Sequence, residues 1–434
     1  MKKTFGKPER NAPRAAQVNA PKESNTSSSS QFCAHFTKKK CGGCSSLHKP
    51  YQEQLAAKQA KVKTLLEQAL KFAPEHIKNS ALNAMQPIVP SPKTMGYRAS
   101  AKFCLHEDRY GHRAIGLYMQ GSRVVVDTAG CPANVDLANV ILKKMFAKRS
   151  IIPARFYDHQ GRVFQKARFK FLTIRTSPSG NGTNRDAAVI ISHTGIDKKA
   201  IAKWLDLAGL KDLTVYESRL TKADEDNFTG RYIDHVSGPE TFPYLLNDQT
   251  YQLSPAAFFQ ANHSLGPGLI AGATSFQQEG DVLLDLYSGF GAYSFDLAGR
   301  FKKIFIVDGN SAAIKTANDH AKKIGVSHLE AHADMCENFL EAKLPTEMAP
   351  RVTHVITNPS RSGMSPRVIR LLEPSKLPNL KELHYVSCNP ETLCRDIKLL
   401  LTHGLVLTSI QPFDMFPQTD HVEVVAKFSR PRPA

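Results

Sequence analysis

The sequence has no apolar run long enough to cross a membrane, and no apolar segment near its start that could act as a secretory signal. Cysteine is sparse, with 8 residues in a chain of 434, so the disulfide framework of a secreted protein is not expected. Acidic residues are too few to balance the basic ones, and the formal net charge is +18. These absences predict a cytoplasmic globular protein, without membrane attachment, whose partner is a nucleic acid.

Composition and periodicity divide the chain into four parts. Residues 1–30 are basic and polar, which predicts a disordered arm. Residues 31–84 hold three cysteines and then an amphipathic helical pattern over residues 51–72. Residues 85–254 alternate short β-rich runs with Gly, Pro and Asn, as in a mostly antiparallel β domain. Residues 255–434 alternate apolar strands with helical stretches, so we expect a doubly wound α/β domain there.

The run VLLDLYSGFGAYSFDLA, residues 282–298, predicts a buried strand, a glycine turn and a helix. Gly289 and Gly291 would let the backbone pass close to a ligand at the carboxyl end of the strand. The next strand ends in Asp308, which could accept hydrogen bonds from ribose hydroxyls. The third glycine of the dinucleotide fingerprint is missing, which favours S-adenosylmethionine over NAD. A further strand runs into Asn358 and a proline, which predicts either a ligand contact at the same edge or an ordinary turn.

Cys388, in YVSCNPETL, follows a late strand of the same sheet, where it could be a buried filler, a metal ligand or a nucleophile. Glu423 lies on the approach to the last strand. Beside a methyl donor, a thiolate and a carboxylate make methylation of uracil C5 possible. The thiolate would add to C6, and the carboxylate would later remove the C5 proton. A buried cysteine and a surface glutamate are the alternatives that the residues alone leave open.

Three further cysteines, Cys33, Cys41 and Cys44, are closely spaced, and Cys131 follows in AGCPAN. Four thiolates would suit a [4Fe–4S] cluster. A structural zinc ion and a redox C-x-x-C pair are the competing interpretations. Cys104 could replace Cys131 as the fourth ligand, but its strand-like surroundings predict a core position, and the same holds for Cys394.

The motifs YVSCNPETL, FDMFPQTDHVE, NPSR and LSPAAFFQAN together resemble those of the RNA uracil-C5 methyltransferase family, over residues 33–428. The resemblance implies a Rossmann-like class I methyltransferase domain, preceded by an RNA-binding β domain with an iron–sulfur segment. It implies that Cys388 is the nucleophile and Glu423 the base. The positions that match contacts to the methyl donor or the target base are Gln260, Tyr287, Asp308 and Asn358. The cysteines that match the cluster ligands of the ribosomal branch are Cys33, Cys41, Cys44 and Cys131.

Details of the motifs bear on the RNA substrate that the resemblance implies. Asn358 stands where many relatives have aspartate, and the cysteine spacing and short arm are similar to the 23S ribosomal RNA branch that lacks a TRAM domain. Ser360 replaces the usual proline, and Asp308 stands where glutamate is common. We therefore expect a monomeric enzyme that makes 5-methyluridine in 23S ribosomal RNA. The alternatives are the same reaction on transfer RNA or another ribosomal uridine, and a cluster-bearing RNA-binding or assembly protein without activity.

Overall fold

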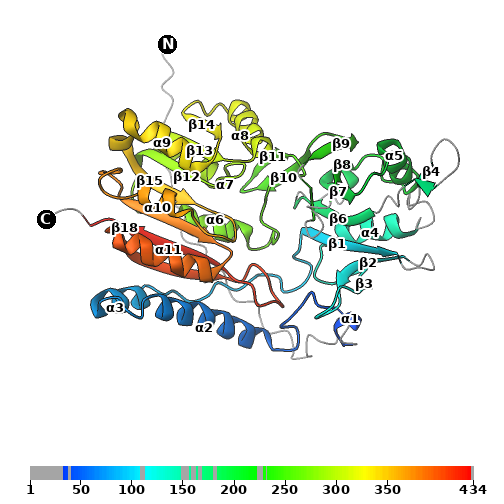
Figure 1. The fold of residues 1–434 in the computed structure, drawn as a ribbon, viewed down its shortest axis with the longest axis horizontal. Coiled ribbons are helices and arrows are strands. Elements are labelled where there is room, and N and C mark those ends of the chain that lie inside the picture. The colour runs from blue at the N-terminus through cyan, green and yellow to red at the C-terminus, as the bar shows by residue number, and fades with distance from the viewer. Residues whose placement is uncertain are drawn as a thin grey trace, which may run out of the picture.

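The structure is a computed structural model, which describes residues 33–37, 41–107, 113–147, 156–157, 163–164, 169–178, 183–221, 228–230 and 232–431. The arm expected at residues 1–30 lies outside them. Two seven-stranded sheets stand side by side (Figure 1). No helix in these ranges is long and apolar enough to cross a membrane.

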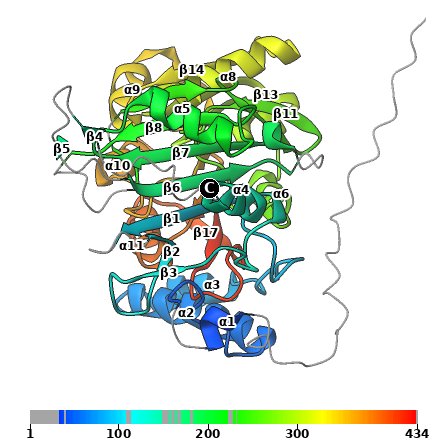
Figure 2. The ribbon, with the colours of Figure 1, turned by 90° about the vertical axis from the view of Figure 1, so that its right-hand side faces the viewer.

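The first sheet is antiparallel except for its β7–β8 pair. Its strands, in spatial order, are β3 (Val125–Asp127), β2 (Arg113–Tyr118), β1 (Ser100–Glu107), β6 (Phe169–Thr176), β7 (Ala187–His193), β8 (Thr214–Arg219) and β9 (Ile233–Ser237). Helices α4 (Asp136–Ala147) and α5 (Lys198–Leu207) share a core with one face of it and lie in front of it in Figure 2. Two short strands, β4 (Phe156–Tyr157) and β5 (Val163–Phe164), pair separately.

The second sheet is doubly wound. Its strands, in spatial order, are β14 (Leu329–Ala333), β13 (Phe301–Asp308), β12 (Gly280–Leu286), β15 (Val352–Thr357), β16 (Glu382–Ser387), β18 (Glu423–Ser429) and β17 (Val406–Phe413). Five strands are parallel, and β18 runs antiparallel to both of its neighbours. Every residue of β15 and β16 is buried, because helices cover both faces of a parallel sheet. The expected Rossmann-like sheet is confirmed.

The two faces of this sheet bury separate cores. One core includes residues of α9 (Cys336–Lys343), α10 (Pro366–Leu371) and α11 (Pro390–Thr402). The other includes residues of α6 (Gly266–Thr274), α7 (Ala292–Asp296) and α8 (Ser311–Ile324), and of the hairpin formed by β10 (Phe242–Leu246) and β11 (Gln249–Leu253). Hairpin and sheet therefore share one hydrophobic interior.

The N-terminal helices α2 (Tyr51–Ala69) and α3 (Glu75–Asn83) pack on the second sheet, although they precede the first in sequence. Leu55, Val62 and Leu66 recur at helical spacing on the buried side of α2, and α2 runs beside α11 (Figure 1). The short helix α1 (Ala34–Thr37) lies below β2 and β3 in the same view. Residues 41–97 therefore connect the edge of the first sheet with the underside of the second.

Candidate active site and cysteine cavity

The strand order of the second sheet reverses at β12, whose two neighbours are β13 and β15. Ligands of open α/β sheets bind at the carboxyl ends of the strands at such a switch point. Tyr287 follows β12 with a left-handed backbone (φ 56°), and Asn358 follows β15, where its N–H donates to the Leu286 carbonyl 3.3 Å away. Both predicted residues therefore lie at the switch-point crevice.

The glycine turn and Asp308 are joined by hydrogen bonds. Gly289 has φ 58°, and its N–H donates to Oδ2 of Asp308 at 2.8 Å. The N–H of Asn310 donates to Oδ1 at 2.7 Å. A carboxylate has about four acceptor positions, so Asp308 retains capacity for ribose hydroxyls after both backbone bonds. Its position at the end of β13 fits the predicted role.

Asp285 also belongs to this edge, although it was not among the predicted site residues. It is fully buried near the end of β12, and its Oδ2 accepts a hydrogen bond from Ser294 at 2.7 Å. Its Oδ1 is buried without a hydrogen-bond partner. Burial raises the pKa of this carboxyl to about 7, and the charge of Asp308 raises it further. An unsatisfied buried oxygen beside a glycine turn fits a site that a polar ligand completes.

Cys388 lies between the end of β16 and the start of α11. The residues after it define that junction, because the Asn389 side chain caps the helix by accepting from the Glu391 N–H and Pro390 occupies the first turn. The thiol is partly exposed, and burial raises its pKa, as does the charge of Glu423. The guanidinium of Arg361 lies within hydrogen-bonding reach and lowers the pKa. Arg361 therefore favours the thiolate form, although the sequence did not single it out.

Strand direction brings Glu423 to Cys388. Because β18 is antiparallel to β16, its first residues lie beside the last residues of β16, and Ser387 pairs with Val424. Glu423 begins β18 and is buried. Burial raises the pKa of its carboxyl to about 7, whereas the charge of Arg361 lowers it. A carboxyl group able to gain or lose a proton near neutral pH thus stands beside the thiol.

Tyr293, on α7, lies between Glu423 and two of the predicted residues, Asn358 and Gln260. Its hydroxyl accepts a hydrogen bond from the Asn358 side-chain amide at 3.2 Å. Gln260, which is buried, also hydrogen bonds to the Tyr293 hydroxyl. Burial and then the charge of Glu423 raise the pKa of Tyr293, whereas the hydrogen bond with Gln260 lowers it. Tyr293 follows the glycine turn in the sequence, and this position is the signal that could have identified it.

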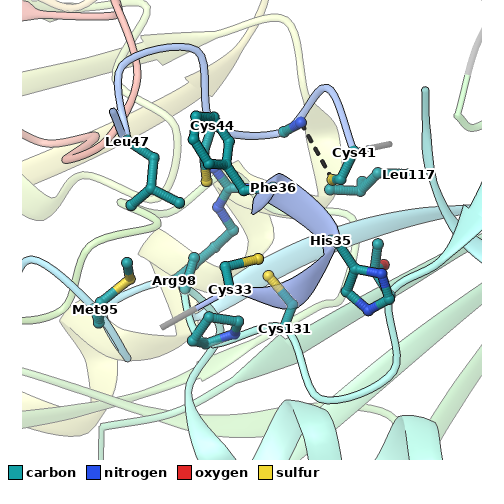
Figure 3. Close-up of a pocket in the computed structure, with 14 residues that line it drawn as sticks. Cys33, His35, Phe36, Cys41, Cys44, Leu47, Met95, Arg98, Leu117 and Cys131 are labelled. Atoms are coloured by element: carbon teal, nitrogen blue, oxygen red, sulfur yellow. Dashed lines mark hydrogen bonds between the residues drawn. The ribbon is translucent and has the colours of Figure 1, made fainter. Parts of the chain in front are cut away.

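The four predicted cluster cysteines line one cavity next to the first sheet (Figure 3). The residues around it include Cys33, Cys41, Cys44, Leu47, Arg98 and Cys131. A methyl group at Gly43 would lie 2.6 Å from Leu117, and the Gly43 N–H donates to the Cys41 sulfur at 3.3 Å. A side chain at this position would therefore displace the Leu117 side chain from the cavity wall.

The positive charge of Arg98 partly offsets the effect of burial on the thiols around the cavity. Burial raises the pKa of the Cys41, Cys44 and Cys131 thiols, that of Cys44 to about 12. The partly buried Arg98 guanidinium opposes this effect. Burial lowers the pKa of Arg98 itself, but Tyr97, Cys131 and Cys44 raise it by more. A partly buried cation beside four thiols fits a negatively charged metal–thiolate centre. Among the described residues, however, no group of three or more His, Cys, Asp or Glu side chains is arranged to hold a metal ion.

The remaining cysteines lie in the core. Cys104, on β1, and Cys394, on α11, are buried among apolar side chains, as expected. Cys336 is buried behind the crevice and accepts a hydrogen bond from the Tyr287 N–H at 3.3 Å.

Comparison with known proteins finds that this chain is similar to RNA methyltransferases. A family model described as tRNA (uracil-5-)-methyltransferase matches residues 239–430. The chain is 26% identical over 410 residues to the 23S rRNA (uracil(1939)-C(5))-methyltransferase RlmD of Aliivibrio fischeri, covering 92% of this chain and 82% of that protein. It is 28% identical over 397 residues to an uncharacterized RNA methyltransferase of Thermotoga maritima, covering 90% and 82%.

A solved structure is similar over most of its length. The tRNA (uracil-54, C5)-methyltransferase of Pyrococcus abyssi, in complex with S-adenosyl-L-homocysteine, superposes with a TM-score of 0.64 at 25% identity. The match covers 89% of this chain and 86% of that one. The likeness thus includes both sheets, whereas the family model matches only the C-terminal part.

Proposed function

The chain belongs to the RNA uracil-C5 methyltransferase family, and from this premise we propose that it methylates C5 of a uridine in 23S ribosomal RNA through a covalent cysteine adduct. One observation carries the proposal. The antiparallel pairing of β16 and β18 sets Glu423 beside Cys388 at the crevice where the strand order reverses. A binding protein without activity would need neither side chain at that place.

Cys388 supplies the nucleophile. Its sulfur adds to C6 of the uracil, the C5–C6 double bond shifts toward the carbonyl, and C5 becomes able to attack a methyl group. Arg361 supports this step because its charge favours the thiolate that must attack.

Glu423 acts after the methyl group has been transferred. Its carboxylate takes the C5 proton, the double bond re-forms, and the Cys388 sulfur leaves C6. Burial suits this role because a base with a pKa of about 7 is deprotonated in part at neutral pH and can still hold the proton that it removes.

The residues at the switch point fit S-adenosylmethionine, which when bound supplies an electrophilic methyl group on a sulfonium centre. Asp308 would accept hydrogen bonds from the ribose, and the unpartnered oxygen of Asp285 offers an acceptor beside it. Tyr287, Gln260 and Asn358 would orient the donor or the target base.

The ribosomal substrate is supported by relatives such as the A. fischeri enzyme, whose name specifies 23S ribosomal RNA. The P. abyssi relative acts on transfer RNA, which makes transfer RNA the second candidate. Mass-spectrometric mapping of 5-methyluridine in both RNAs, with and without this gene, decides between them. We expect loss of one ribosomal 5-methyluridine, and complementation with Cys388→Ala should not restore it. Loss from transfer RNA alone would refute the ribosomal assignment.

Basic side chains line the junction between the first sheet and the crevice. Arg175, on β6, lies with its guanidinium 5.3 Å from the Phe259 ring centroid and donates to the Ala257 carbonyl. Its Nε is buried without a hydrogen-bond partner, and burial alone lowers its pKa to about 10. Burial lowers the pKa of Lys102, and the charges of Arg175 and Arg361 lower it further, so the three cations lie near one another. We propose that RNA phosphates near the target uridine neutralise them.

We further propose that Cys33, Cys41, Cys44 and Cys131 hold a [4Fe–4S] cluster. Four cysteine thiols around one cavity and the partly buried Arg98 are the support for this assignment. Anaerobic purification followed by iron and sulfide analysis should find about four of each per chain. One zinc ion without sulfide would contradict the proposal.

A further inference from the structure

Most of the loop that precedes Glu423 is buried. It joins β17 to β18 and spans residues 414–422. Asp414 and Met415 are fully buried, and Gln418 is buried with a left-handed backbone at φ 68°. Loops normally run over the surface because their backbone groups need partners. Most of the partners of this loop come from the N-terminal part of the chain, and one, Asn262, donates to the Met415 carbonyl at 3.2 Å.

Gln54, on α2, makes the most specific of these contacts. Its side-chain oxygen accepts from the Gln418 backbone N–H at 2.9 Å, and its amide nitrogen donates to the Gln418 side-chain oxygen at 2.8 Å. The same nitrogen donates to the Lys49 carbonyl at 3.0 Å. One buried side chain thus satisfies both the backbone and the side chain of a residue in an unfavourable conformation.

Lys58, one helical turn further along α2, binds the start of the loop. Its ammonium group forms a buried ion pair with Asp414 and donates to the Phe416 carbonyl at 3.0 Å. Burial lowers the pKa of Lys58, whereas the charge of Asp414 raises it. Removal of either partner would leave an uncompensated buried charge, so the pair opposes movement of the loop.

Two contacts link the same loop to the cysteine cavity. Ser46, two residues after Cys44, donates from its N–H to the Gln418 carbonyl at 3.0 Å and from its hydroxyl to Asp420. Tyr97 donates from its hydroxyl to the Pro417 carbonyl at 2.9 Å, and its neighbour Arg98 lines the cavity. The loop is therefore held from α2 and from the cavity wall.

We propose that Ser46, Gln54, Lys58 and Tyr97 form a clamp that positions the loop carrying Glu423, and that the clamp transmits the state of the four-cysteine cavity to this base. The inference rests on the proposed function, because it assigns the clamp a role in one step of that reaction. The clamp residues are positioning residues, since they touch the loop and not the reacting atoms.

A weakened clamp has two consequences for Glu423. Movement of the carboxylate away from C5 slows proton removal, and a misplacement of about 1 Å can cost about 10²-fold in rate. Water that enters around the carboxyl removes part of the desolvation that raises its pKa to about 7, so that pKa falls. Formation of the adduct by Cys388 is affected less, because β16 and α11 position the cysteine.

The test compares Gln54→Ala and Ser46→Ala with Gln52→Ala, a matched control at an exposed position of α2. The probe is unmodified 23S ribosomal RNA made by transcription, and the readout is the protein–RNA adduct that survives denaturing electrophoresis. We expect both clamp variants to accumulate adduct, with slower release of methylated RNA by about tenfold or more. Their rate–pH profiles should shift to lower pH, and Gln52→Ala should match the unaltered protein.

The Glu423→Gln variant distinguishes failure of the proposed reaction from failure of the proposed clamp. If it forms no adduct, the proposed reaction is wrong. If it forms the adduct but the clamp variants neither accumulate adduct nor shift the profile, the clamp is wrong even when their melting temperatures fall.

The link to the cavity is tested without activity. Hydrogen exchange of the amides of residues 414–423 is measured in the protein as purified, after iron chelation and in Cys44→Ser, with β16 as the internal reference. We expect faster exchange in the loop after either treatment and no change in β16. Equal exchange in the loop under all three conditions would overturn the transmission of the cavity state.

Discussion

Glu423 is a carboxyl group that the fold keeps away from water and beside a thiol. Desolvation disfavours its charged form, which is why its pKa rises to about 7 instead of remaining near 4.5. Asp285 is affected in the same way at the donor end of the crevice. Raised carboxyl pKa values at one edge of a sheet are typical of functional sites.

The pH dependence of the reaction follows from this burial. A general base must be deprotonated, so resolution of the RNA adduct should accelerate as pH rises through about 7. Single-turnover release of methylated RNA between pH 5 and 9 measures this. A rate already constant above pH 5 would show that the base is a carboxyl group with an ordinary pKa, or another group.

Arg175 allows a test of RNA contact at a single residue. Arg175→Ala should weaken RNA binding and lower the slope of log affinity against log salt by about 1, because one phosphate contact is lost. Lys199→Ala removes an exposed charge from α5 and serves as the control. Equal salt slopes for the two variants would contradict phosphate binding by Arg175.

At the scale of elements, α2 is a helix from one end of the chain that completes the core of a domain from the other end. Its buried face includes Val62 and Leu66, which pack in the same core as residues of α11 and β17. The opposite face carries polar residues, as the periodicity predicted. The helix therefore both contributes hydrophobic burial and presents Gln54 and Lys58 to the loop after β17.

Substitution of Leu66 tests how much α2 contributes to the stability of the second sheet. Leu66→Ala should lower the free energy of unfolding by about 2–5 kcal/mol, because a fully buried side chain is replaced by a cavity. Denaturant unfolding monitored within the C-terminal domain gives this value. Thr64→Ala, at an exposed position of α2, should change it by less than about 0.5 kcal/mol. A small effect of Leu66→Ala would mean that the helix is dispensable for that domain.

For the whole molecule, histidines with lowered pKa values contribute to the response to acid. Burial lowers the pKa of six of them, namely His193, His263, His320, His332, His384 and His421. A histidine with a lowered pKa contributes stability above its unfolded pKa of about 6.5, and loses it as pH falls. Asp285 and Glu423 act in the opposite direction. Their raised pKa values let the folded state bind protons between about pH 4 and pH 7, so these two groups stabilise the fold as pH falls.

Six histidines outnumber two carboxyl groups, so we expect the melting temperature to fall from pH 7 to pH 5 at constant ionic strength. Calorimetry at three pH values checks the sign. Glu423→Gln removes one opposing group and should steepen the fall. A melting temperature that rises toward pH 5 would show that the two carboxyl groups dominate.

Much of the site could be predicted because its residues stand where local patterns change. A glycine turn after an apolar strand, an acid at the end of the next strand and a cysteine before an Asn-Pro helix start are all visible in short stretches of sequence. The doubly wound order follows from alternating strands and helices. These features depend on local periodicity and turn chemistry, which a single sequence carries.

Only the tertiary structure decided which of these residues meet. The antiparallel course of β18 brings Glu423 to Cys388, and a shared cavity brings Cys131 to three cysteines that precede it by more than eighty residues. Arg361, Tyr293 and the clamp on the loop after β17 were likewise absent from the predicted site. The physical reason is that strand register and helix packing join residues distant in sequence, and no local pattern encodes their partners. Residue types and strand ends were determined by the sequence itself, whereas their proximity and their protonation depend on the packed fold.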